Sequence, residues 1–68
     1  MFYRGTLIKR LHLNGDQCVD IVGRQDGSYQ FIHRHPCNDN ISAPTVFESS
    51  PYISAEAAEA AVRQKFKL

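Results

Sequence analysis

The most reactive side chains of this sequence gather in one short run, His-Arg-His-Pro-Cys at positions 33 to 37. Alternate residues of a strand point to the same side, so His33 and His35 would project together, as a pair of metal-binding imidazoles does. Cys37 would add a thiolate. The chain has no second His-x-His and no Cys-x-x-Cys to supply further ligands. We therefore expect no metal site, with His33, His35 and Cys37 as its weak candidates.

Catalytic groups are present only as isolated residues. A nucleophile, base and acid would have to be assembled from Ser49 or Ser50, one of the two histidines and Asp39. A chain of 68 residues offers little material for the concave, water-excluding pocket that such groups need. The four glycines are scattered singly, so no phosphate-binding loop is expected. We predict no enzymatic activity, no catalytic residues and no cofactor.

Composition predicts one small globular domain, residues 1 to 68, near the lower size limit for a single core. Hydrophobic residues make up 43% and charged residues 22%, which argues against disorder. The formal net charge of +1 gives no general attraction to nucleic acid or anionic membranes. No apolar run is long enough to cross a bilayer, and the N-terminus is not of signal-peptide type. We expect a cytoplasmic protein with no membrane partner and two reduced cysteines.

Two glycine turns divide the first half of the chain into three predicted strands, at about 2–13, 17–24 and 28–35. Asn14-Gly15 is typical of a two-residue hairpin turn, and this turn would pair Leu11 with Cys18 and Lys9 with Asp20. The register depends on this loop length, because a change of one residue moves every side chain to the other face.

The second turn is predicted as a three-residue loop, Gln25-Asp26-Gly27, with Gly27 in the left-handed conformation. Cys18 then pairs with Arg34. If the strand continued, Cys37 would lie three residues further on, at about 3.3 Å per residue. This separation predicts that Cys18 and Cys37 form no disulfide.

The second half predicts a short strand at 45–48 and a helix at about 54–66. Ser54 is a good N-cap, and basic residues gather at the helix C-terminus. The fold class is therefore α+β: a three- to four-stranded antiparallel meander with one C-terminal helix packed on one face. The helix packing stripe contains Ala55, Ala58, Val62 and Phe66.

Both faces of the predicted sheet carry apolar residues, and the single helix covers only one of them. One face would hold Ile8, Val19, Ile21, Tyr29 and Phe31. The other would expose the set that we predict as a protein interface: Leu7, Leu11, Val22 and Ile32. An exposed apolar face on a thin core predicts a homodimer, or contact with another protein.

Nucleic-acid binding is the alternative function. Arg4 and Arg10 share one strand face, and Arg34 lies nearby in the predicted sheet. Tyr29 and Phe31 would then stack on bases. The small net charge argues against this alternative, since single binding modules usually carry a basic footprint. A further alternative that fits the size is a phage- or plasmid-borne inhibitor of a host protein complex.

The run Asp26-Gly-Ser-Tyr-Gln-Phe31, a short strand, and then Ser50-Pro-Tyr-Ile-Ser-Ala-Glu56 resemble the YegP-like family of small bacterial proteins of unknown function, over residues 26 to 66. The chain lacks that family's Asn-Gly between its second and third strands, and the unit is not duplicated. The resemblance implies an antiparallel sheet with a packed helix, a dimer, and no assigned activity. Taken together, we predict a small non-enzymatic binding or regulatory module.

Overall fold

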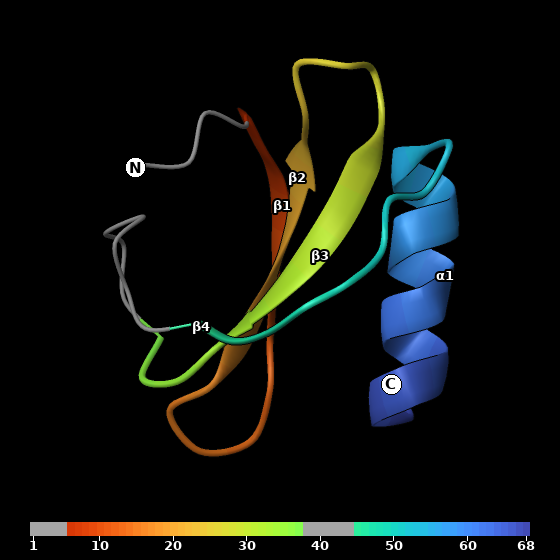
Figure 1. Cartoon of the computed structure of the whole chain (residues 1–68). Coiled ribbons are helices and arrows are strands. Elements are labelled where there is room, and N and C mark those ends of the chain that lie inside the picture. The colour runs from red at the N-terminus through yellow and green to blue at the C-terminus, as the bar shows by residue number, and fades with distance from the viewer. Residues whose placement is uncertain (1–5, 38–44) are drawn as a thin grey trace.

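A computed structural model describes residues 6–37 and 45–68 of the chain. Four antiparallel strands form one sheet in the order in which they occur in the sequence, and a helix follows them. In Figure 1 the helix lies against one face of this sheet, which confirms the predicted α+β meander. The elements are β1 (Thr6–His12), β2 (Cys18–Gly23), β3 (Tyr29–Arg34), β4 (Thr45–Glu48) and α1 (Ala55–Phe66). Within the described ranges, no helix is both long and apolar enough to span a membrane.

The second hairpin has the predicted three-residue loop. Arg24 N–H donates to the Ser28 carbonyl at 2.8 Å and so closes the loop over residues 25–27. Gly27 has a φ of 87°, the left-handed region in which glycine is favoured. Asp26 Oδ1 accepts from Ser28 N–H at 2.9 Å and fixes the turn further. The resulting register pairs Cys18 with Arg34, as predicted.

The first hairpin differs from its prediction by one residue. Leu13 N–H donates to the Gln17 carbonyl at 3.0 Å, so the loop spans residues 14–16 rather than two residues. As a consequence Leu11 pairs with Val19 and not with Cys18. Leu11 therefore lies on the helix side of the sheet, where it packs against the core. Its prediction as an exposed interface residue was wrong, because the loop is longer than Asn14-Gly15 alone.

A β-bulge corrects the shift further along β1. The register changes between Leu7 and Lys9, which leaves Ile8 as the additional residue. Beyond the bulge, Leu7 pairs with Val22, the pairing predicted from a two-residue turn. The N-terminal part of β1 thus has the predicted register, while the part next to the loop is shifted by one residue relative to the prediction.

The helix forms the core with β2 and β3. Ser54 is the N-cap, with its Oγ accepting from Ala57 N–H at 3.0 Å, and Lys67 ends the helix in the left-handed conformation. Small residues on the inner side of the helix let it lie close to the strands, as the predicted stripe requires. The buried core cluster consists of Val19, Ile21, Phe31, Ala58 and Val62.

The other face of the sheet, here called the second face, is not the exposed apolar surface that the sequence predicted. Val22 and Ile32 are only 4% and 2% exposed, whereas Leu7 is 51% exposed. Long polar side chains that bond to one another lie beside them: Arg24 Nη1 donates to Gln30 Oε1 at 2.8 Å. Two of the four predicted interface residues are therefore inaccessible to a partner, and of the four only Leu7 is largely exposed on this face.

Candidate functional site

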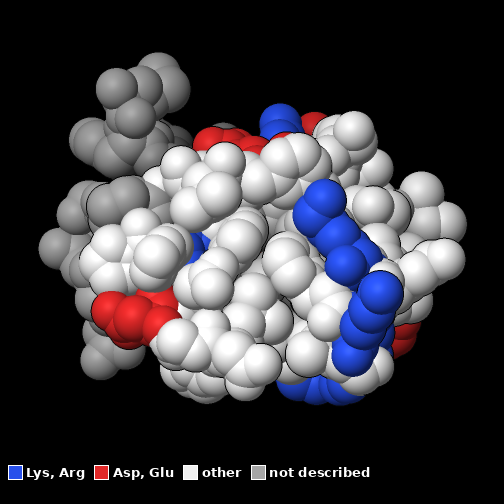
Figure 2. All heavy atoms as spheres, turned by 90° about the horizontal axis from the view of Figure 1, so that it is seen from below, with Lys and Arg blue, Asp and Glu red and all other residues white. Residues whose placement is uncertain are grey.

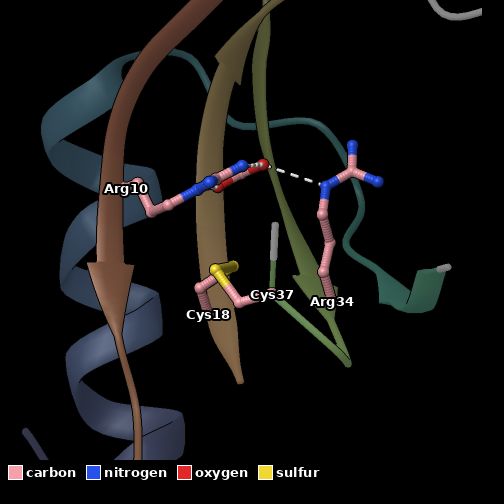
Figure 3. Close-up of polar contacts among 5 residues, drawn as sticks. Arg10, Cys18, Arg34 and Cys37 are labelled. Carbon is pink, nitrogen blue, oxygen red and sulfur yellow. Dashed lines mark hydrogen bonds and ion pairs between the residues drawn. A yellow bond between two sulfur atoms is a disulfide. The ribbon is translucent and has the colours of Figure 1, made fainter. Parts of the chain in front are cut away.

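Asp20 lies at the centre of an ionic cluster on the second face, where it bonds to Arg10 and Arg34, which are labelled in Figure 3. Arg10 Nε lies 2.6 Å from Asp20 Oδ1, and Arg10 Nη2 lies 3.0 Å from Oδ2, a bidentate pair. Arg34 Nε lies 2.9 Å from Asp20 Oδ2, with its side chain only 4% exposed. Burial raises the pKa of the Asp20 carboxyl, but the two guanidinium groups outweigh it and hold the pKa below its usual 3.8.

This cluster changes what the predicted nucleic-acid residues can do. Arg10 and Arg34 both bond to the same buried carboxylate. Their guanidinium groups therefore neutralise a buried charge and do not form a phosphate-binding surface. Phe31, one of the two predicted stacking rings, is buried in the helix-side core. Arg4 lies outside the described residues.

Cys18 and Cys37 form a disulfide, contrary to the prediction that they lie out of reach. The prediction extended the third strand in a straight line, but β3 ends at Arg34 and the chain bends at His35 and Pro36. This bend returns Cys37 toward the start of β2, so that the two Cα atoms are 5.4 Å apart. Cys37 N–H also donates to the Asp16 carbonyl at 2.8 Å.

Two of the three predicted metal candidates, His33 and Cys37, have other contacts, and the third, His35, is exposed. His33 Nε2 lies 2.8 Å from Gln17 Oε1, and its ring contacts Phe66 edge-on at a centroid distance of 5.1 Å. Burial, followed by the charges of His35 and Lys65, lowers the pKa of His33 below its usual 6.5. The Cys37 sulfur is bonded to Cys18 and is no thiolate ligand. Among the residues that the structure describes, no three His, Cys, Asp or Glu side chains are grouped to hold a metal ion.

Two shallow hollows in the described part of the chain are the candidate small-molecule sites. One of about 340 Å³ lies over Gly23, between Ile8 and the Tyr29 ring, with Arg24 on its rim. The other, of about 270 Å³, lies between the first hairpin loop and Phe66. The first is lined by no histidine, cysteine or carboxylate, and the second by a single histidine, His12. Neither brings together the acid, base and nucleophile that catalysis would require.

The β4 edge of the sheet exposes apolar residues to about the same extent as the β1 edge, where Leu7 and Ile8 are 51% and 49% exposed. Val46 is 57% exposed and Phe47 is 42% exposed. After β4 the chain continues along β3, with Ser49 N–H donating to the Phe31 carbonyl at 3.0 Å, before it reaches α1 (Figure 1). Phe47 pairs with His33 and so lies on the helix side, where its ring centroid is 5.9 Å from that of Phe31.

A lysine of the helix completes this edge. Lys65 Nζ lies 4.5 Å from the centroid of the Phe47 ring, a cation–π contact between the last turn of α1 and the outer strand. Arg63 and Lys67 belong to the same end of the helix, and Arg63 bonds to Glu59 at 2.7 Å. Figure 2, viewed toward this end of the molecule, shows blue lysine and arginine atoms beside a wide uncharged area. We call Val46, Phe47 and Lys65 the β4 surface.

Sequence reasoning missed the β4 surface because it assigned each residue separately. The sequence predicts Val46 and Phe47 on a short strand and Lys65 at the negative end of the helix dipole, each from its own local signal. Two sequence signals were available: an aromatic residue on a four-residue edge strand, and a lysine next to Phe66 in the last helical turn. Neither signal says that the helix end and the edge strand meet.

Comparisons with protein-family models, with curated proteins and with solved structures find no match for this chain, so its resemblance to the YegP-like family stays a prediction.

Proposed function

We propose that the chain is a small non-enzymatic binding module that acts through protein–protein contact at the β4 surface. The observation that carries this proposal is the exposed Phe47 ring on an outer strand, with the Lys65 ammonium 4.5 Å from its centroid. Aromatic residues are enriched at the centre of interfaces, and the adjacent Lys65 ammonium adds a charge that can select a partner of complementary charge. The predicted interface on the second face is replaced by this one.

Three of the side chains that could perform acid–base chemistry have structural partners, which supports binding over catalysis. Asp20 is bonded to two arginines, and His33 is bonded to Gln17. Glu59 accepts from Lys9 at 3.0 Å and from Arg63 at 2.7 Å, and these bonds lower the pKa of its carboxyl. Each of these groups stabilises the fold in the state that the structure shows.

The occupant that this surface fits is an extended segment of a partner protein with apolar and acidic side chains. β4 is last in the strand order, so a segment can add to its outer edge as a further strand. Side chains of neighbouring strands lie about 5 Å apart on the same face. A carboxylate next to Phe47 on the added strand would therefore meet Lys65.

A second copy of this chain fits the same edge less well. A symmetric antiparallel pair centred on Phe47 would bring Lys65 of each copy toward Lys65 of the other, and like charges in close contact oppose association. The homodimer expected from the sequence is thus the competing occupant. The cytoplasmic location stays a prediction. The disulfide argues against it, because disulfides are rare in cytosolic proteins.

Two short synthetic peptides test the proposal by fluorescence anisotropy. Both alternate valine with a charged residue, which is aspartate in one and lysine in the other. We expect the acidic peptide to bind, and Lys65→Glu or Phe47→Ser to weaken it by about tenfold or more, since a charge-assisted bond contributes about 1.5–3 kcal/mol. Ile53→Ser is the matched control: it removes another exposed apolar side chain, which lies outside the β4 surface.

Three outcomes would contradict the proposal. Equal affinity for the two peptides would remove the role of Lys65. A wild-type dimer in sedimentation that dissociates in Phe47→Ser would assign the β4 surface to a second copy of this chain. Salt-sensitive binding of a single-stranded oligonucleotide, in the absence of peptide binding, would support the nucleic-acid alternative.

A further inference from the structure

We propose that the Cys18–Cys37 disulfide is a redox-sensitive latch, which holds the bend after β3, residues 35–37, to the start of β2 and opens without unfolding the core. Cys18 is the first residue of β2 and is fully buried, whereas Cys37 is half-buried. The latch therefore has one sulfur in the interior and one within reach of a reductant. This inference does not rest on the proposed binding function.

The position of the disulfide limits what its opening can disturb. Cys18 pairs with Arg34 and lies on the second face, on the same side of the sheet as the Asp20 cluster (Figure 3). The buried cluster that joins the sheet to α1 lies on the opposite face and does not contain Cys18. Breaking the sulfur–sulfur bond therefore leaves the packing of Val19, Phe31 and Val62 in place.

The segment that the latch holds is attached at two neighbouring points. Cys37 N–H donates to the carbonyl of Asp16, and the sulfur of Cys37 is bonded to Cys18, two residues further along the chain. The disulfide thus joins the bend after β3 to the first hairpin loop and to β2. When the covalent bond is lost, Arg34 stays paired with Cys18 and bonded to Asp20, so β3 remains attached to β2. Beyond Arg34, the described attachment of the bend is the hydrogen bond from Cys37 N–H to the Asp16 carbonyl, which is worth about 1 kcal/mol. Such an attachment opens readily on its own.

The opening step is ordinary thiol–disulfide exchange with a dithiol. A thiolate of the dithiol attacks Cys37 Sγ, the Cys18–Cys37 bond breaks, and Cys18 leaves as a thiolate that takes up a proton. The second thiol of the reagent then displaces Cys37, which also becomes a thiol, and the reagent is left as a cyclic disulfide. Two electrons pass to the protein. The reduced Cys18 side chain remains buried as a small apolar residue.

Amide hydrogen exchange measured on the oxidised and dithiothreitol-reduced protein tests the latch. We expect exchange at Cys37 to accelerate by at least about tenfold, the factor for roughly 1.4 kcal/mol of lost local protection. Amides of α1 and of the middle of β2 should accelerate by no more than the loss of global stability accounts for, and they should stay protected relative to the unfolded chain. The double variant Cys18→Ala/Cys37→Ala is the control, because its exchange should be insensitive to the reductant.

Each remaining outcome overturns the latch. Two titratable thiols in protein purified without reductant would show that the bond does not form. Unchanged exchange after complete reduction would show that the bond holds nothing in place. Loss of protection at all amides, with loss of the near-ultraviolet circular dichroism signal, would show that the disulfide supports the whole fold rather than one segment.

Discussion

Arg10 and Arg34 reach the same carboxylate from opposite sides: β1 and β3 flank β2, and Asp20 is paired with Arg10 on one side and bonded to Arg34 on the other. Three strands are thus joined by one buried anion. Because a buried charge is stable only when it is paired, this relationship makes the second face ionic at its centre. It also removes two arginines from the surface.

Replacing Asp20 by asparagine should therefore be strongly destabilising. The two guanidinium groups would lose their shared anion in a buried position, and breaking a buried pair in this way costs about 3–5 kcal/mol. Urea denaturation measures the loss. The matched control is Glu59→Gln, which breaks an exposed pair with Lys9 and Arg63 and should cost less than about 1 kcal/mol. Equal losses in the two variants would contradict the assignment.

The stability of the protein should fall as the pH drops below 6.5. Burial lowers the pKa of His33 in the folded protein, so the unfolded chain binds the proton more readily once the pH falls below the ordinary value of 6.5. The loss continues until the pH reaches the folded pKa and then levels off. Thermal unfolding at a series of pH values should show this slope in the wild type and in the exposed-site control His35→Gln. A His33→Gln variant that keeps the slope would refute the prediction.

Removing the disulfide should lower the equilibrium stability even though the core survives. Cys18 and Cys37 are separated by 19 residues, and closing a loop of this size in the unfolded chain contributes about 3 kcal/mol in the chain-entropy model. The variant Cys18→Ala/Cys37→Ala should unfold at a correspondingly lower urea concentration with a native circular dichroism spectrum. The wild type in excess reductant should match it, and a wild type that is unaffected by reductant would argue against the bond.

Gly27 should tolerate alanine less well than Gly23 does. Gly27 has a φ of 87°, where a Cβ is disfavoured by roughly 1–2 kcal/mol, and no atom within 4 Å would otherwise obstruct it. Gly23 has no such backbone angle, and an added Cβ would make an ordinary contact at 3.4 Å with the Tyr29 ring. Denaturant midpoints of the two alanine variants compare them directly. A larger loss at Gly23 would show that the turn does not require the left-handed conformation.

Features with a strong local cause were predictable from the sequence. Gly27 after Gln25-Asp26 predicts a three-residue loop with one left-handed residue, and Ser54 before an alanine-rich stretch predicts a capped helix. The strand at 45–48 follows from its residue types and its turn boundaries. In each of these cases a single short segment contains all of the information.

Features that join distant segments were not predictable. The disulfide depends on the bend at His35 and Pro36, which turns Cys37 back toward Cys18. The number of residues between the two cysteines does not predict the direction of this bend. The β4 surface depends on the contact between Lys65 of α1 and Phe47 of β4. These two elements meet only because of the way the helix packs on the sheet. The ionic cluster depends on a strand register that the first turn alone did not specify.

The extra residue at Ile8 has a wider consequence than a local kink. It acts as a phase change in the alternation of β1: before it, Leu7 points to the second face, and after it, Leu11 points to the core and Arg10 to Asp20. Leu11 and Arg10 are neighbours and point to opposite faces by ordinary alternation. Without the inserted residue Leu7 would share the face of Leu11. With it, Leu7 joins Val22 on the second face, so that β1 places an aliphatic side chain on each side of the sheet.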